Sequence, residues 1–167
     1  MSFLLWLEQT GVGRFVRESQ SLLGYPTFTV LHTFGLSVVV GISAMIAARL
    51  VGIAPGIPLS PLKKLFPIIW FGFVINLISG SGLAAAAAST TIPSPMFVAK
   101  ITFVIIAVVL LRKLQVGVFN DPEVDNKPLE KSTKVLGGAL LGVWLFAMIC
   151  GRLIGYTVDL LPPLIGP

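Results

Sequence analysis

Three basic residues that interrupt long apolar segments are the ones in this sequence that could do chemistry. His32 is the only histidine of the chain and lies inside the apolar run "VLHTFG". Lys100 and Arg152 interrupt two other apolar runs. Ionisable groups are costly in a bilayer and usually mark a binding site or a partner. We therefore take these three residues as candidates for a polar site inside the membrane.

The three residues are expected at one depth in the membrane. His32 lies six residues after Pro26, Lys100 five residues after Pro95, and Arg152 seven residues before Asp159. At about 1.5 Å per helical residue, each lies roughly 8 to 10 Å from the outer end of its helix. This agreement predicts one outward-facing basic pocket, to which the second apolar run adds Ser79 at a similar depth and Asn76 slightly deeper.

The pocket is expected to bind an anionic ligand, because no carboxylate lies at the same depth. The candidates are a haem b with its propionates, a quinone head that gains negative charge on reduction, and the phosphate of an acidic phospholipid. His32 would ligate the haem iron or orient the cofactor, while Lys100 and Arg152 would hold its anionic groups. The second axial ligand of a haem would be Met96, a symmetry-related His32, a residue of a partner, or none. In the alternative interpretation, Lys100 and Arg152 extend to the interface and His32 makes one hydrogen bond between helices.

Composition predicts the elements that position these residues. Hydrophobic residues make up 55% of the chain and charged residues only 11%, as is typical of integral membrane proteins. A helix needs about 20 apolar residues to cross a bilayer, and four such segments are present. We predict an all-α membrane protein of one domain, with a four-helix bundle preceded by an amphipathic interfacial helix. The expected spans are 26–51, 65–88, 95–111 and 135–158, the interfacial helix is 2–19, and the cytoplasmic loop is 112–134.

The distribution of basic residues predicts the orientation. Lys and Arg concentrate in the loops after the first and third spans, whereas the turn between the second and third spans has none. Short basic loops stay on the cytoplasmic side, so both termini are expected in the periplasm of a bacterial inner membrane. These loops also account for the net charge of +5, so we do not expect nucleic acid as a partner.

Two stretches, "VRESQSLLGYPTFTVLHTFGLSVVVG" and "SPMFVAK", form a further pattern with these residues: Arg17, Glu18, Ser19, Tyr25, Pro26, His32, Gly35, Gly41, Phe97 and Lys100. This pattern resembles that of a family of uncharacterised small bacterial inner-membrane proteins with four predicted spans. It implies a four-span bundle but supplies no reaction. A looser similarity of architecture links the chain to cytochrome b561 and copper-resistance membrane domains.

The expected function is that of a cofactor-binding subunit in a larger redox assembly that transfers electrons. The apolar spans contain no Asp or Glu to share a proton with His32, so an enzyme acting alone is not expected. The alternative is a structural subunit that anchors a membrane complex and binds acidic lipid. The expected partners are membrane lipids and either other membrane or periplasmic subunits or further copies of the chain.

Overall fold

The computed structural model describes residues 3–157, and all regular secondary structure in that range is helical. Four of its helices are long and apolar enough to cross a membrane, so the predicted class of a four-helix membrane bundle is confirmed. The elements in order are α1 (Phe3–Glu8), α2 (Gly11–Glu18), α3 (Tyr25–Val51), the short 3₁₀ helix η1 (Ser60–Leu65), α4 (Phe66–Ala86), α5 (Ala88–Thr91), α6 (Pro95–Gly117) and α7 (Lys131–Thr157).

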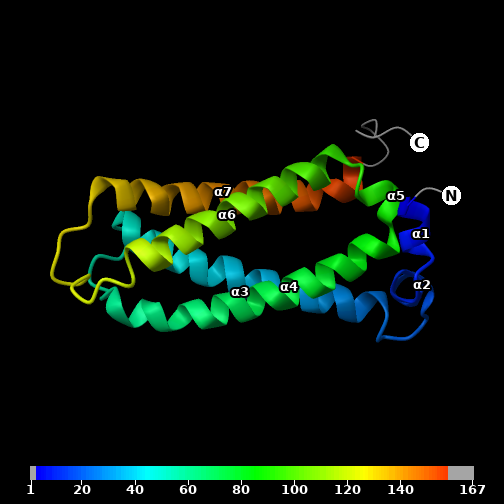
Figure 1. The fold of residues 1–167 in the computed structure, drawn as a ribbon, viewed down its shortest axis with the longest axis horizontal. Helices are drawn as coiled ribbons and strands as arrows, with labels where there is room; N and C mark the ends of the chain where they lie inside the picture. Colours follow the sequence, from blue (N-terminus) through cyan, green and yellow to red (C-terminus); the bar gives the residue numbers. More distant parts are fainter. Residues whose placement is uncertain (1–2, 158–167) are drawn as a thin grey trace.

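The four long helices run along the length of the molecule (Figure 1). We call the end that carries α1, α2 and α5 the capped end, and the end formed by connectors 52–65 and 118–130 the loop end. Helix α3 packs on α4 and α7, and α6 packs on α7. Helices α4 and α6 approach each other less closely, and near the loop end the Trp70 indole N–H of α4 donates a hydrogen bond to the Gln115 side-chain oxygen of α6 at 3.1 Å. The bundle is therefore closed on three sides and loosely joined on the fourth.

The observed helices differ from the predicted spans mainly near the loop end. Helix α6 continues to Gly117, six residues beyond its expected end, and α7 begins at Lys131 rather than at 135. The predicted bounds followed hydropathy, but Arg and Lys are good helix formers and let the helices extend past the apolar segment. The predicted second span, 65–88, corresponds mainly to α4, which ends where Ala87 leaves the helical conformation with φ of −141° and ψ of 48° and separates α4 from α5. Val158 lies outside the described residues.

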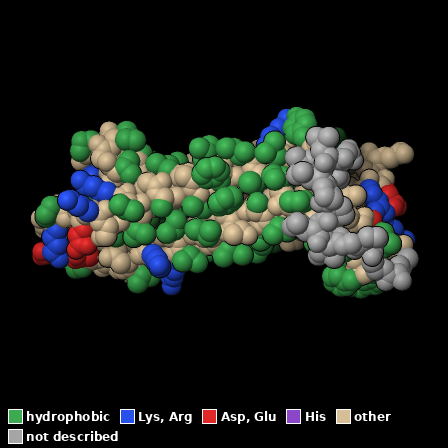
Figure 2. Space-filling model, turned by 90° about the horizontal axis from the view of Figure 1, so that it is seen from above, with side chains coloured by type: hydrophobic (Ala, Val, Ile, Leu, Met, Phe, Trp, Pro, Cys, Tyr) green, Lys and Arg blue, Asp and Glu red, His purple; other side chains and the backbone are tan. Residues whose placement is uncertain are grey.

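The apolar core lies in the half of the bundle next to the loop end. Its largest buried side chains come from the four long helices and the connectors: Ile46, Leu50, Leu59, Phe66, Ile69, Leu111, Leu114, Phe119 and Leu140. The outer surface is also apolar along its middle, and Lys and Arg gather toward the ends (Figure 2). This pattern fits a bundle that is packed internally at one end and surrounded by lipid.

A close crossing holds α3 against α4 near the middle of the bundle. A Cβ atom on Gly35 would lie 2.8 Å from the Asn76 amide nitrogen and 2.8 Å from the Gly72 carbonyl oxygen. Only glycine lets the two backbones approach this closely. The crossing lies beside His32 and Asn76, so it also brings the predicted site residues of α3 and α4 together.

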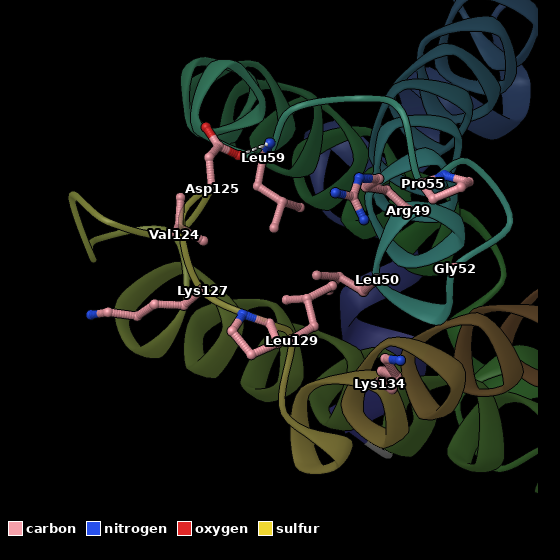
Figure 3. Close-up of a pocket in the computed structure, with 11 residues that line it drawn as sticks. Arg49, Leu50, Gly52, Pro55, Leu59, Val124, Asp125, Lys127, Leu129 and Lys134 are labelled. Atoms are coloured by element: carbon pink, nitrogen blue, oxygen red, sulfur yellow. Dashed lines mark hydrogen bonds between the residues drawn. The ribbon is translucent and has the colours of Figure 1, made fainter.

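Asp125 joins the two connectors at the loop end. Its carboxylate accepts a hydrogen bond from the backbone N–H group of Leu59 (Figure 3). It also accepts one from the backbone N–H of Ser60, with Oδ2 lying 3.1 Å from the Ser60 nitrogen. The Ser60 side chain and these backbone hydrogen bonds hold the pKa of Asp125 below its ordinary value. A cavity of about 270 Å³ lies beside them, lined in part by Arg49 and Lys134.

The N-terminal segment forms two short helices at the capped end instead of the single predicted helix. Thr10 ends the first and caps the second, because its Oγ1 accepts a hydrogen bond from the Gly13 N–H at 3.2 Å. Glu8 ties the segment to α5, since Oε1 accepts hydrogen bonds from Ser89 N–H at 2.7 Å and from Ser89 Oγ at 2.6 Å. The Ser89 hydrogen bonds, aided by Arg17, lower the pKa of Glu8.

Candidate functional site

His32 is fixed to α4 by a reciprocal pair of contacts with Asn76. The ring Nδ1 lies 3.1 Å from the Asn76 backbone oxygen, and the Asn76 Nδ2 donates to the His32 backbone oxygen at 2.8 Å. A carbonyl oxygen can only accept, so this contact assigns the proton to Nδ1. In the neutral ring, Nε2 then carries the free lone pair.

Ser79 and Gly80 of α4 also contact the His32 ring. The Ser79 Oγ is buried, lies 3.4 Å from the ring Nδ1 and donates to the Ile75 carbonyl at 2.6 Å. The ring rests on Gly80, where an added Cβ would lie 2.8 Å from Cε1. A side chain at position 80 would therefore displace the imidazole.

Lys100 reaches the other side of the ring from α6. Its Nζ lies 3.5 Å from His32 Nε2, the nitrogen that carries the lone pair. The Lys100 stem lies on Gly151 of α7, where an added Cβ would approach the Lys100 Cδ to 3.3 Å. Within the described residues, no carboxylate makes an ion pair with Lys100. Among the described residues, the pair thus presents an ammonium group without a counter-ion.

Two cavities flank the pair formed by His32 and Lys100. The end cavity has about 340 Å³ and is lined near the capped end by Tyr25, Thr91, Gly151 and Gly155, among others. The side cavity has about 150 Å³ and lies between α4 and α6, where its walls are Phe73, Asn76, Leu77, Ser81, Ile101 and Val104. His32, Gly80, Ala84, Phe97 and Lys100 line both cavities. The polar pair therefore lies where the two cavities adjoin.

The structure brings four of the six predicted site residues together and leaves two apart. Asn76, Ser79 and Lys100 each contact His32 as described. Arg152 is exposed, and its Nη2 lies 3.3 Å from the Tyr156 hydroxyl, over whose ring the guanidinium packs at 5.6 Å from the centroid. Met96 lies on α6 one turn before Lys100, but it lines neither cavity.

Gly80 and Gly151 were not predicted as part of the site. Each provides the flat surface on which a site side chain lies, and neither contributes a reactive group. The sequence offers one signal, because "SGSG" places small residues within the second apolar run near the depth of His32. Small residues allow close approach, but the residue that approaches is known only once the helices are packed.

The loop-end cavity is a weaker candidate for a binding site. Arg49, its main cation, donates a hydrogen bond through Nε to the Ile57 carbonyl and lies close enough to Asp125 to lower the pKa of that carboxyl. Its charge is thus partly neutralised within the protein. Within residues 3–157, no group of three or more His, Cys, Asp or Glu side chains is placed to hold a metal ion.

Comparison of the chain with protein-family models, with curated proteins and with solved structures found no match. A function therefore has to be inferred from the pair formed by His32 and Lys100 and from its two cavities. The pair can donate a hydrogen bond from an ammonium group and has apolar walls on both sides. Such an arrangement suits a ligand with a flat apolar ring and an electron-rich oxygen atom.

Proposed function

We propose that this protein binds the head of a quinone between His32 and Lys100 and serves as a cofactor-binding subunit in a membrane redox assembly. The observation that carries the proposal is the Lys100 ammonium group, half-buried, without a carboxylate partner among the described residues, and 3.5 Å from a fixed imidazole. A bound quinone would supply reversible uptake of electrons and protons and would gain negative charge at its oxygens on reduction.

The residues of the chain would bind and orient this head. Lys100 Nζ would donate to one quinone oxygen, and the hydrogen bond would strengthen as that oxygen gains charge. Asn76 and Ser79 would keep the His32 ring in place, with Nδ1 directed at the Asn76 carbonyl. Phe97, which lines both cavities, would pack on the face of the quinone ring.

A haem b is the second candidate for the same site. The contact of Nδ1 with a backbone carbonyl supports it, because such a contact is the usual outer partner of a metal-binding histidine and leaves Nε2 free. Lys100 Nζ, however, lies where iron would approach Nε2, and Met96 lines neither cavity. This arrangement favours the quinone.

We also propose that the capped end faces the periplasm of a bacterial inner membrane. Eight of the twelve Lys and Arg residues lie at or near the loop end, namely Arg49, Lys63, Lys64, Arg112, Lys113, Lys127, Lys131 and Lys134. The positive-inside rule assigns such an end to the cytoplasm. Electrons would then reach the quinone from a periplasmic or membrane partner subunit.

Equilibrium binding tests the quinone proposal. A short-chain naphthoquinone would be titrated into the purified full-length protein in mild detergent, and bound quinone would be separated from free and measured by absorbance. Loss of the hydrogen bond from a charged donor is worth about 1.5 to 3 kcal/mol, so Lys100→Met should weaken binding by about 10- to 100-fold. The matched control is Lys113→Met, an exposed lysine on the same helix, which should bind like wild type.

The competing functions give different results in the same preparation. Absorption bands that sharpen on reduction with dithionite, and that disappear in His32→Ala, would show that the site binds a haem rather than a quinone. A colourless protein that binds no quinone and retains acidic phospholipid would favour the structural, lipid-binding subunit instead.

A further inference from the structure

The side cavity lies where the bundle is least closed. Helix α3 packs on α4 and α7, and α6 packs on α7, whereas α4 and α6 lie farther apart and are joined near the loop end by the hydrogen bond from Trp70 to Gln115. The side cavity occupies this fourth side, with walls from α4 and α6 and with His32 and Lys100 at its inner end. In a membrane, this side of the bundle faces lipid rather than water.

The walls of the side cavity are apolar and reach the surface. Leu77 of α4 is 56% exposed and Ile101 of α6 is 40% exposed, whereas Phe73 and Val104 lie deeper. A path lined by these residues leads from the surrounding lipid to the polar pair. Such a path matches a ligand with a polar head and a long apolar tail.

We infer that the ligand is a long-tailed, lipid-soluble quinone that enters from the bilayer between α4 and α6 and leaves its tail in the side cavity. The inference rests on the proposed function and adds the substrate class and the route of entry. The head would lie at Lys100 and extend toward the end cavity, while the isoprenoid tail would pass between Leu77 and Ile101 into the lipid. The tail would then contribute to affinity by burying apolar surface.

The alternative route is through the end cavity. That cavity is lined by Tyr25 and Thr91 near the capped end, so a ligand from the water phase or the interface would enter there. A quinone bound by this route would have no tail between α4 and α6. Obstruction of the side cavity would then have the same effect on short-tailed and long-tailed ligands.

Two probes with the same naphthoquinone head distinguish these routes. One carries a tail of a few carbons and the other a long isoprenoid tail. The variants Leu77→Trp and Ile101→Trp place a large ring in the side cavity of the full-length protein. Their matched controls are Ile78→Trp and Ile106→Trp, which change exposed residues of the same two helices outside the side cavity.

We expect the side-cavity variants to lower the affinity for the long-tailed probe at least about tenfold. The affinity for the short-tailed probe should fall less than about twofold, since only the tail is displaced. Binding of the short-tailed probe also reports that the variants are folded. The entry route is overturned if both probes lose affinity equally, or if neither does. The proposed function itself fails if wild type binds neither probe, a result that differs from both.

Discussion

At the residue scale, the proposed binding site depends on how His32 is held in place. The imidazole is fixed by the Asn76 carbonyl on one side and rests on Gly80, so that its lone pair faces Lys100. A ring free to rotate would lose this alignment. The glycine is therefore as important to the geometry as the groups that make hydrogen bonds.

Gly80→Ala should disturb the site without removing any polar atom. The added Cβ would lie 2.8 Å from His32 Cε1, so the ring must move and its hydrogen bond to Asn76 must lengthen. A lost hydrogen bond is worth about 1 kcal/mol, which corresponds to about a fivefold loss of quinone affinity. Gly41→Ala is the control, since nothing lies within 4 Å of its Cβ position. Equal quinone affinity of Gly80→Ala and Gly41→Ala would show that the contact of the His32 ring with Gly80 is not important for binding.

The structure places only some of the predicted site residues together, and the reason is geometric. Counting residues along each helix gives depth, and by depth His32, Lys100, Ser79 and Asn76 were expected near one another. It gives no direction around the helix axis. Successive residues on a helix are about 100° apart, so once Gly151 faces Lys100, Arg152 must face elsewhere. The direction of Arg152 follows from the packing of α7, which the sequence pattern alone does not define.

Asp125 makes the loop end sensitive to acid. Its pKa is lowered in the folded state by hydrogen bonds from the Ser60 side chain and from the N–H groups of Leu59 and Ser60. A carboxyl with a lowered pKa stabilises the fold at pH values above its ordinary value of about 3.8, and this contribution is lost as the pH falls further toward the folded pKa. Limited proteolysis of connector 118–130 should therefore accelerate below about pH 4 in wild type.

Asp125→Asn should show rapid cleavage already at neutral pH, because the amide lacks the charge that the two N–H groups stabilise. Glu123→Gln, an exposed acidic residue of the same connector, should cleave like wild type. If cleavage in Asp125→Asn kept the wild-type rate and pH dependence, Asp125 would not be what holds the two connectors together.

At the scale of elements, helix type could be predicted and helix ends could not. Hydropathy located all four long helices, because an apolar run of this length has one stable form in lipid. It did not locate the ends of α6 and α7, where charged residues continue the helix beyond the apolar segment. It also did not reveal that Thr10 would divide the N-terminal segment.

The capped end should loosen when Glu8 is removed. Glu8→Ala deletes two hydrogen bonds to Ser89, and a bond to a charged group is worth about 1.5 to 3 kcal/mol when buried. Because Glu8 is near the surface, we expect the free energy of local opening of α1 and α2 to fall by about 1 to 2 kcal/mol. Hydrogen exchange in these helices should then be about five- to thirtyfold faster. Glu18→Ala, an exposed acid of α2, is the control. Unchanged exchange in Glu8→Ala would show that α1 and α2 are held by other contacts.

At the scale of the whole molecule, the two halves of the bundle are built differently. The half next to the loop end contains the buried apolar core, while the half next to the capped end contains the polar pair and its two cavities. A densely packed half holds the four helices in register, and the open half is free to bind a ligand. This division is the structural basis for a site in so small a bundle.

The orientation can be tested by labelling single cysteines in intact cells. Asn126→Cys, in the connector at the loop end, should react with a membrane-impermeant maleimide only after the cells are broken. Gln20→Cys, exposed between α2 and α3, should react from outside. The native Cys150 is buried and serves as the background control. The opposite pattern of labelling would reverse the orientation and place the site toward the cytoplasm.

Binding of a quinone by Lys100 and His32 is tested most directly by the quinone content of the protein as purified from its own membrane. Wild type, Lys100→Met and Lys113→Met would be isolated in mild detergent, and their extracted lipids would be separated by chromatography. We expect a long-tailed quinone in wild type and in Lys113→Met, close to one per chain, and little or none in Lys100→Met. No quinone in wild type, or the same amount in Lys100→Met, would contradict it.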